Sequence, residues 1–288
     1  MRVSGVDARK PAPSFGEKLV ISFRPRQLYL LALFFLLGGS APASAVTFFG
    51  EVPTGLVELK DYHYPVYLFV PENYKPERSY SLLIAVPGEG ESPAENIKFW
   101  LSQAKRQSLM VLSPTNLRPE EEPYAMDRWL LRLKKDITDR YHISPERIYL
   151  VGKGGGAHYA SYLGTRYPRE FSAVALLGGS WAGKFEKLIH PQSQPRRQVP
   201  FFVSLKEGNS LLEKTKQWIY RFEKKGYPVY FEQLESSEDF TSADFQKRLL
   251  KWLDEKGQHW QDRIRESQKS TKEKIRRGLE EYFNKVSS

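Results

Sequence analysis

The sequence predicts an α/β protein with a doubly wound, mostly parallel sheet and a C-terminal helical extension. Strand-like and helix-like segments alternate from residue 57 to residue 254, the order that produces a parallel sheet covered by helices on both faces. The apolar run 82–86 stops abruptly at Pro87-Gly88-Glu89-Gly90, as a buried parallel strand does. A glycine-rich turn at 152–156 joins another apolar run to a helix-like segment. With 288 residues, 40% of them hydrophobic, the chain can build one sizeable core.

The elements follow from apolar patterning. Two short β-rich segments, 57–59 and 66–70, end at Pro71 and predict an antiparallel pair at the sheet edge. Further strands are expected at 82–86, 109–112, 148–151, 173–177, 201–205 and 227–234. Helical spacing predicts helices at 94–106, 126–141, 211–225 and 244–254, with another following the glycines at 154–156.

Residues 1–45 have the pattern of a secretory signal. Arg24 and Arg26 precede an apolar run at 28–37, which is too short to span a bilayer comfortably. Ala43-Ser44-Ala45 then provides a small-residue cleavage site before Val46. We therefore expect an exported protein, periplasmic or extracellular, with an uncleaved anchor as the alternative. The chain has no cysteine, so disulfides and thiolate chemistry are excluded.

The formal net charge of +10 is unevenly distributed. Residues 1–45 carry a net charge of +4 and residues 255–288 a net charge of +3, which leaves +3 for the domain at 46–254. The basic side chains do not form a recognisable nucleic-acid-binding motif, so nucleic-acid binding is not expected.

Residues 255–288 predict an amphipathic helix, because their apolar residues recur at helical spacing and no proline interrupts them. The apolar positions are Trp260, Ile264, Ile275, Leu279, Tyr282 and Val286. Such a helix can pack back on the domain, bind a protein partner or lie on an acidic envelope surface. Since the α/β pattern is complete by Asp254, we expect the domain to fold without residues 257–288.

Residues 148–158 have the frame of a nucleophile elbow without the nucleophile. In a G-x-S-x-G elbow, the serine sits at the apex of a sharp turn between a strand and a helix. Here Gly152 and Gly156 are the flanking glycines and Gly154 occupies the apex, where it has no side chain to attack a carbonyl. Glycines 154–156 at a helix N-terminus could hold an anion, although elbow geometry explains them without a ligand.

Residues 57–254 resemble the α/β-hydrolase superfamily. The resemblance is carried by residues 141–152 (YHISPERIYLVG), the elbow and residues 166–180 (RYPREFSAVALLGGS). It is closest to the poly(hydroxyalkanoate)-depolymerase and feruloyl-esterase-like branch, in which a Pro-x-Arg-Ile-Tyr strand precedes the elbow and a Tyr-Pro-x-x-Phe segment follows the elbow helix. The resemblance implies the α/β-hydrolase fold and an esterase-like origin.

The resemblance also implies where a catalytic triad would lie. The nucleophilic serine of the family falls on Gly154. The acid of the family follows the strand at 201–205, where this chain offers Glu207, Gly208 or Asn209, and we place the replacement at Asn209. The histidine of the family belongs in the loop 235–240, where Asp239 lies near the expected place and no histidine occurs. The sequence therefore predicts a degenerate triad.

The same resemblance implies a vestigial cleft for ligand binding. Its oxyanion hole would use the backbone N–H of Gly155 and one from Gly88-Glu89-Gly90, with Glu89 at the donor position. Lys153 could place a cation over this cleft, and Ser180 lies at the sheet edge where hydrolase sites gather; a solvated lysine and a loop turn are the plainer interpretations. His158 could also face a cleft, and packing of its helix is the plainer interpretation. No metal or other cofactor is expected, because the remaining histidines lack metal-ligand spacing.

These observations predict an exported, catalytically inactive pseudo-esterase. It would bind an unknown ligand or protein partner through its old cleft or its tail. The alternative is an active carboxylic-ester hydrolase whose nucleophile and base come from unexpected positions.

Overall fold

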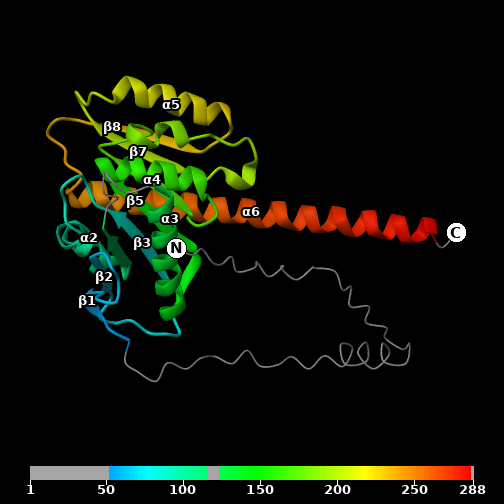
Figure 1. Ribbon diagram of the computed structural model, residues 1–288, viewed down its shortest axis with the longest axis horizontal. Helices are drawn as coiled ribbons and strands as arrows, with labels where there is room; N and C mark the ends of the chain where they lie inside the picture. Colours follow the sequence, from blue (N-terminus) through cyan, green and yellow to red (C-terminus); the bar gives the residue numbers. More distant parts are fainter. Residues whose placement is uncertain (1–51, 116–122, 287–288) are drawn as a thin grey trace, which may run out of the picture. The chain divides into compact units, whose positions relative to one another are not determined.

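The computed structural model describes residues 52–115 and 123–286. Eight strands form one mixed sheet in the order β1-β2-β4-β3-β5-β6-β7-β8, with helices on both faces (Figure 1). The predicted leader, with Arg24, Arg26 and the Ala43-Ser44-Ala45 site, lies outside the described residues. Within the described ranges, no helix combines the length and the apolarity that a membrane span requires.

The sheet is antiparallel at one edge and parallel elsewhere, as the sequence predicts. Strand β1 (Gly55–Glu58) pairs antiparallel with β2 (Val66–Val70), and β2 pairs antiparallel with β4 (Met110–Pro114). The remaining strands, paired in parallel, are β3 (Tyr80–Val86), β5 (Ile143–Lys153), β6 (Ala173–Leu177), β7 (Phe201–Lys206) and β8 (Val229–Leu234). Strand β5 begins at Ile143 rather than Ile148, because Ile143 pairs with Tyr80 before a register shift restores regular pairing at Leu82.

The helices lie where helical spacing predicts them, with one exception at the C-terminus. They are α2 (Pro93–Gln107), α3 (Pro123–Arg140), α4 (Gly155–Arg166), α5 (Leu212–Lys224) and α6 (Ala243–Val286), and two 3-10 turns, η1 (Gly183–Leu188) and η2 (Pro195–Arg197), precede β7. The exception is α6, which combines the expected helix at 244–254 and the expected tail helix in one continuous element.

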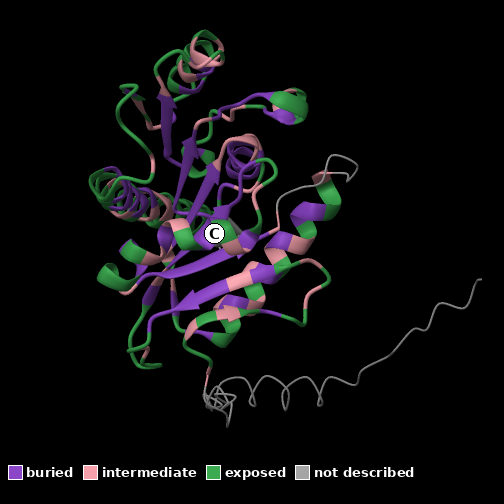
Figure 2. Ribbon diagram, turned by 90° about the vertical axis from the view of Figure 1, so that its left-hand side faces the viewer, coloured by how far each residue is buried: buried purple, intermediate pink, exposed green. Residues whose placement is uncertain are grey.

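Two apolar cores pack against the two faces of the sheet. Side chains of α3, α4 and α5 join the core on one face, and side chains of α2 and the first part of α6 join the core on the other. Figure 2 shows the buried strands between helices whose outward sides are exposed. The sheet therefore holds the turns at its C-terminal edge on a rigid base.

The boundary between domain and tail lies further along the chain than the sequence suggested. Trp260 is 1% exposed and belongs to the core that includes α3 and α4. Ile264 packs against the same core, and Arg265 forms an ion pair with Glu146 at 2.9 Å. The stretch up to Arg265 therefore packs back on the domain, which counts against the expectation that the domain folds without residues 257–288. Beyond it, Ile275, Leu279 and Tyr282 are exposed.

A buried carboxylate joins α3 to α4. Asp127 is fully buried, and its two carboxylate oxygens accept hydrogen bonds from the hydroxyls of Tyr159 (3.0 Å), Tyr162 (2.7 Å) and Tyr167 (3.0 Å). Burial raises the pKa of Asp127 above its ordinary value, although the three tyrosine hydrogen bonds oppose that shift. This network fixes α4, the helix that follows the elbow.

Candidate functional site

The elbow retains its sharp turn around a glycine apex. Gly154 lies between β5 and α4 with φ 52° and ψ −119°, a conformation that glycine adopts without a steric penalty. Its N–H donates to the carbonyl of Leu177 at 2.8 Å, and its carbonyl accepts from Ala157 at 3.0 Å. The predicted strand, turn and helix are therefore present.

The glycines around the apex are required by close backbone contacts. A Cβ on Gly152 would lie 2.2 Å from the carbonyl oxygen of Gly156, and a Cβ on Gly156 would lie 2.2 Å from that of Pro87. At Gly154, by contrast, the nearest atom to such a Cβ is the Cα of Gly88 at 4.0 Å. The apex has room for a side chain that the sequence does not supply.

The loop after β3 lies over the start of α4, where the resemblance places an oxyanion hole. The backbone nitrogen of Glu89 is 3.7 Å from the place where a Cβ of Gly155 would lie. Glu89 and Gly90 are exposed, and Gly90 has a positive φ of 73°. The Glu89 side chain therefore lies on the surface, while its backbone approaches the elbow.

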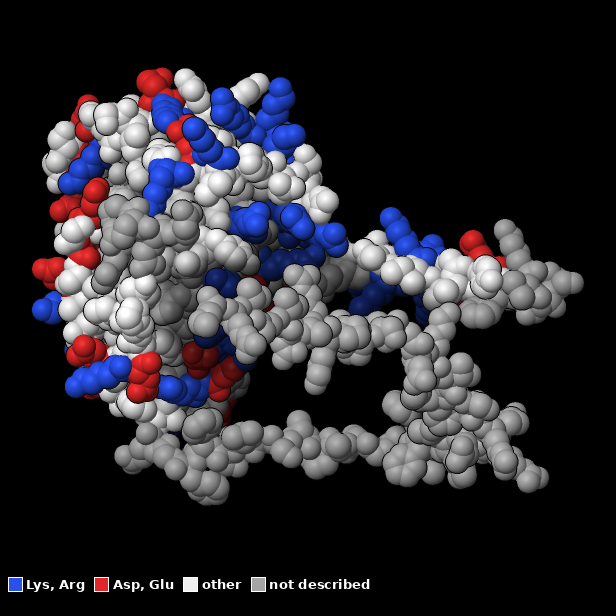
Figure 3. Space-filling model, in the orientation of Figure 1, with Lys and Arg blue, Asp and Glu red and all other residues white. Residues whose placement is uncertain are grey.

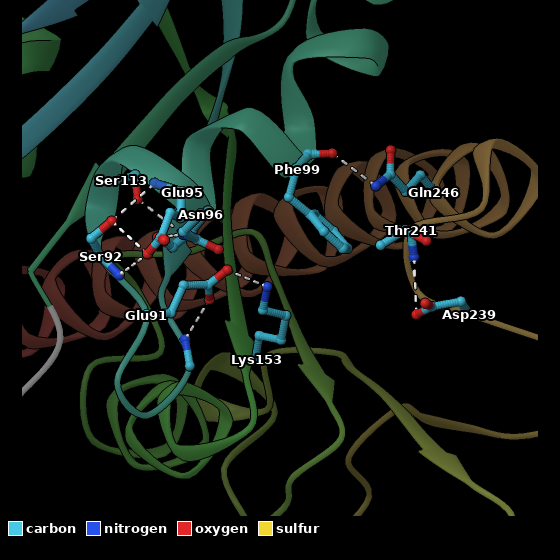
Figure 4. A network of polar contacts seen from close by, with 12 residues as sticks. Glu91, Ser92, Glu95, Asn96, Phe99, Ser113, Lys153, Asp239, Thr241 and Gln246 are labelled. Carbon is cyan, nitrogen blue, oxygen red and sulfur yellow. Dashed lines mark hydrogen bonds and ion pairs between the residues drawn. The ribbon is translucent and has the colours of Figure 1, made fainter.

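Lys153 does not point a free cation over the cleft. Its ammonium forms an ion pair with Glu91 at 2.5 Å and lies 4.6 Å from the centre of the Phe99 ring. The other carboxylate oxygen of Glu91 accepts the N–H of Gly88 at 2.8 Å. Figure 4 shows the charged ends of Glu91 and Lys153 turned toward each other. This bridge ties the loop after β3 to the end of β5, so the expected role of Lys153 as a ligand-binding group is not supported.

The start of α2 holds Glu91 in place. Ser92 caps that helix: its hydroxyl accepts the N–H of Glu95, and Glu95 accepts the N–H of Ser92. Such a capping box satisfies two backbone donors at once. Within the same turn, Asn96 is buried and donates to the carbonyl of Ala85 and the hydroxyl of Ser113. Glu91 directly precedes this fixed turn, so its carboxylate is held where it meets the ammonium of Lys153.

The loops that carry an acid and a histidine in hydrolases are bound to each other here. Asn209 accepts the N–H of Leu211 at 2.9 Å, so its side chain forms a local turn. Asp239 lies 3.8 Å from the ammonium of Lys206, which ends β7, and also accepts the N–H of Thr241 at 3.4 Å. Neither side chain contacts the elbow through any of these hydrogen bonds or ion pairs.

Glu207 and Gly208, the other two candidates for the position of the family acid, do not approach the elbow through hydrogen bonds either. Glu207 is exposed and accepts the hydroxyl of Ser236 at 3.3 Å, and Gly208 supplies a positive φ of 73° to the turn. Phe240 instead approaches the elbow: its ring lies 3.3 Å from the place where a Cβ of Gly178 would be, and that place is 4.0 Å from the nitrogen of Gly154. The Phe240 ring thus covers Gly178, a neighbour of the apex.

His158 and Ser180 contact each other but are used in packing. The Nδ1 of His158 lies 2.6 Å from the carbonyl oxygen of Ser180, which makes Nδ1–H the donor. The side chain of Ser180 is fully buried, and its hydroxyl accepts a hydrogen bond from Thr215 at 2.8 Å. The placement of Ser180 in a ligand-binding cleft is therefore wrong, because its hydroxyl is directed into the layer beneath α5.

Comparisons with solved structures identify the architecture. An α/β-hydrolase enzyme from a Medee basin deep-sea metagenome library is 19% identical, with a TM-score of 0.55 over 70% of this chain and 98% of that chain. The S-formylglutathione hydrolase of Staphylococcus aureus is 13% identical, with a TM-score of 0.54 over 71% of this chain and 99% of that one. The chain has the α/β-hydrolase fold.

A thermostable esterase is a third structural relative, 19% identical with a TM-score of 0.53. The match covers 69% of this chain and 62% of the esterase, so the chain spans less than two thirds of that protein. No protein-family profile matches the sequence, and no curated protein matches it either. At these identities the likeness establishes the α/β-hydrolase fold, and the chemistry has to be argued from the site itself.

The sequence located the elbow of this α/β-hydrolase fold but missed two residues that shape it, Glu91 and Phe240. Opposite charges at Glu91 and Lys153 were visible, but they are 62 positions apart, and only the folded sheet brings them together. Phe240 stands one residue after Asp239 in the loop where a histidine was sought. An unexpected aromatic residue in that loop was the available signal.

Proposed function

We propose that this protein is an exported α/β-hydrolase-fold protein that does not hydrolyse esters and that has a binding or structural role. The glycine apex carries the proposal, because an acyl-transfer elbow needs a nucleophile there and a base within hydrogen-bond reach. Gly154 provides neither group. Next to the apex, Lys153 is paired with Glu91, and the Phe240 ring lies against Gly178.

Ser180 and His158 are the best remaining nucleophile and base for an active esterase. Their geometry does not favour that alternative. The Ser180 hydroxyl faces Thr215 and is inaccessible to substrate, and the Nδ1 of His158 is bound to a backbone carbonyl. A serine nucleophile requires an exposed hydroxyl with a base aligned on it.

We expect the chain to be inert toward p-nitrophenyl acetate and butyrate and toward a fluorophosphonate probe. The Gly154→Ser variant is expected to remain inert, because a positioned general base contributes roughly 10²–10⁴-fold and the loop 235–242 has no histidine. Gly154→Ala is the matched control, since it introduces the same backbone strain without a hydroxyl.

Initial rates and probe labelling of the three proteins decide the question. Covalent labelling of the unmodified chain with turnover above the buffer rate refutes the proposal. Turnover by Gly154→Ser, with none by Gly154→Ala, means that a functional base lies near the apex.

Export is the second component of the proposal and rests on the sequence of residues 1–45. Cleavage after Ala45 is expected to leave Val46 as the first residue of the mature protein. N-terminal sequencing of protein recovered from the envelope or the medium measures this directly. Recovery of an intact leader in a membrane fraction supports the uncleaved anchor instead.

A further inference from the structure

The positive charge of the folded domain is concentrated in one stretch of sequence. Residues 183–225 carry ten basic and four acidic side chains, a net of +6, whereas residues 46–254 together carry only +3. The rest of that domain is therefore net acidic. Figure 3 shows Lys and Arg side chains gathered over α5 and beside it, at the upper right of the visible face. The domain therefore has a basic region although its total net charge is only +3.

A groove lies within this basic region, between η1 and α5. It has a volume of about 770 Å³, within the range of sites that bind small molecules. Its walls are mostly nonpolar, and they include the buried residues Ile189 and Trp218 and the partly buried Pro191. Tyr220 also lines the groove and is 64% exposed. The floor therefore offers apolar and aromatic surface to a ligand.

Cations line the rim of this groove. Lys187, Arg221, Lys224 and Lys225 are all exposed lining residues. The Arg221 guanidinium lies 4.9 Å from the centre of the Trp218 ring, and the Lys224 ammonium lies 5.9 Å from that of Tyr220. Arg221 and Lys224 are thereby kept near aromatic rings that line the groove.

The acidic residue of the lining is already neutralised. Lys214 forms an ion pair with Glu186 at 2.5 Å, and this contact lowers the pKa of Glu186. Among the described residues, no carboxylate forms an ion pair with the four rim cations. The groove therefore presents net positive charge beside apolar surface.

We propose that the groove between η1 and α5 binds a single-chain anionic amphiphile, an acyl or alkyl chain that ends in a phosphate or carboxylate. The apolar floor takes the chain, and the rim cations take the charged end. This site is separate from the elbow, and the proposal holds whether or not the elbow is catalytic. The ligand binds as a monomer from solution.

Calorimetric titration of the full chain with decyl phosphate, below its micelle concentration, tests this proposal. Saturable binding is expected, and octyl phosphate should bind roughly tenfold more weakly, because each buried methylene contributes a few-fold in affinity. Decyl maltoside, with the same chain but no charge, and inorganic phosphate, with the charge but no chain, should show no saturable binding.

Matched variants locate the site. Arg221→Glu/Lys224→Glu should weaken decyl phosphate binding at least about tenfold, and Tyr220→Ala should weaken it as well. Lys98→Glu/Lys247→Glu is the control: it makes the same change in net charge with two exposed lysines of α2 and α6, on the other face of the sheet. Thermal melts verify that each variant is folded.

Any one of five results overturns the proposal. The first is an equal loss of affinity in Arg221→Glu/Lys224→Glu and in the control variant. The second is binding like that of the unmodified chain by both Tyr220→Ala and Arg221→Glu/Lys224→Glu. The third is binding of decyl maltoside as tight as that of decyl phosphate, and the fourth is saturation of the site by inorganic phosphate alone. Binding to anionic vesicles without any titration of monomeric decyl phosphate also refutes it, because the charge would then recognise a membrane surface.

Discussion

Deleting residues 257–288 is expected to abolish cooperative unfolding, whereas deleting residues 267–288 is expected to leave the domain nearly as stable as the full chain. The first deletion removes Trp260, which is 1% exposed, and Ile264, which packs against the same core. Loss of a buried tryptophan side chain alone costs about 3–5 kcal/mol, a large part of the roughly 5–15 kcal/mol that stabilises a typical domain.

Other interactions of the same segment with the domain add to this effect. Gln261 donates to the hydroxyl of Ser172 at 3.3 Å, and Gly257 is buried against Ser172 and Tyr149. Thermal and urea unfolding followed by circular dichroism compare the two truncations. A cooperative transition at an unchanged midpoint in the protein that lacks residues 257–288 would show that the α/β core is complete at Asp254.

Asp127→Ala is expected to lower the free energy of unfolding by roughly 3 kcal/mol, because three tyrosine hydroxyls are left without their common acceptor. Asp127→Asn retains an acceptor oxygen and should cost about 1 kcal/mol. Asp139→Ala, on the exposed side of the same helix, removes only a surface pair with Lys135 and should change stability by about 0.5 kcal/mol or less. Urea titration of the three variants measures these differences.

The pH dependence of Asp127 has a defined sign. Its pKa is raised in the folded protein, mainly by burial, so the folded state binds more protons than the unfolded state between the two pKa values. The stabilising contribution of this group is complete below the ordinary aspartate pKa and decreases as pH rises through the raised value. The stability advantage of the unmodified chain over Asp127→Asn should therefore shrink as pH rises through that window. An advantage that grows with pH would mean that the tyrosine hydrogen bonds outweigh burial.

The sequence predicted the central strands of the sheet well because they are buried on both faces. Runs such as 82–86 and 173–177 are continuously apolar, and that pattern survives whatever the surrounding turns contain. The tail was misjudged for the opposite reason. Trp260 and Leu279 occur in similar amphipathic spacing, yet one is 1% exposed and the other 52%. Periodicity reports which side of a helix is apolar but not where its packing surface ends.

Only the part of the site that depends on local backbone geometry was predicted from the sequence. Close backbone contacts require glycine at positions 152 and 156, and the positive φ at position 154 favours it there, so the elbow could be located from residues 152–156 alone. The Lys153–Glu91 bridge depends on how β3 and β5 align, and the buried orientation of Ser180 depends on Thr215 in α5. Such contacts are set by tertiary packing, which short sequence motifs do not encode.

Helix α6 packs on the domain with its first part and extends beyond it with the rest. It is anchored at Trp260 and has no break before Tyr282, 22 residues and close to six helical turns later. Ile264 and Tyr282 therefore project from nearly the same side of the helix as Trp260, and Ile275 and Leu279 lie within about a quarter turn of it. Residues 265–274 are all polar, and apolar residues resume on this side at Ile275 and continue to Tyr282, roughly 25 Å beyond Arg265. Because the helix is continuous, its packed first part sets the direction in which these residues extend from the domain.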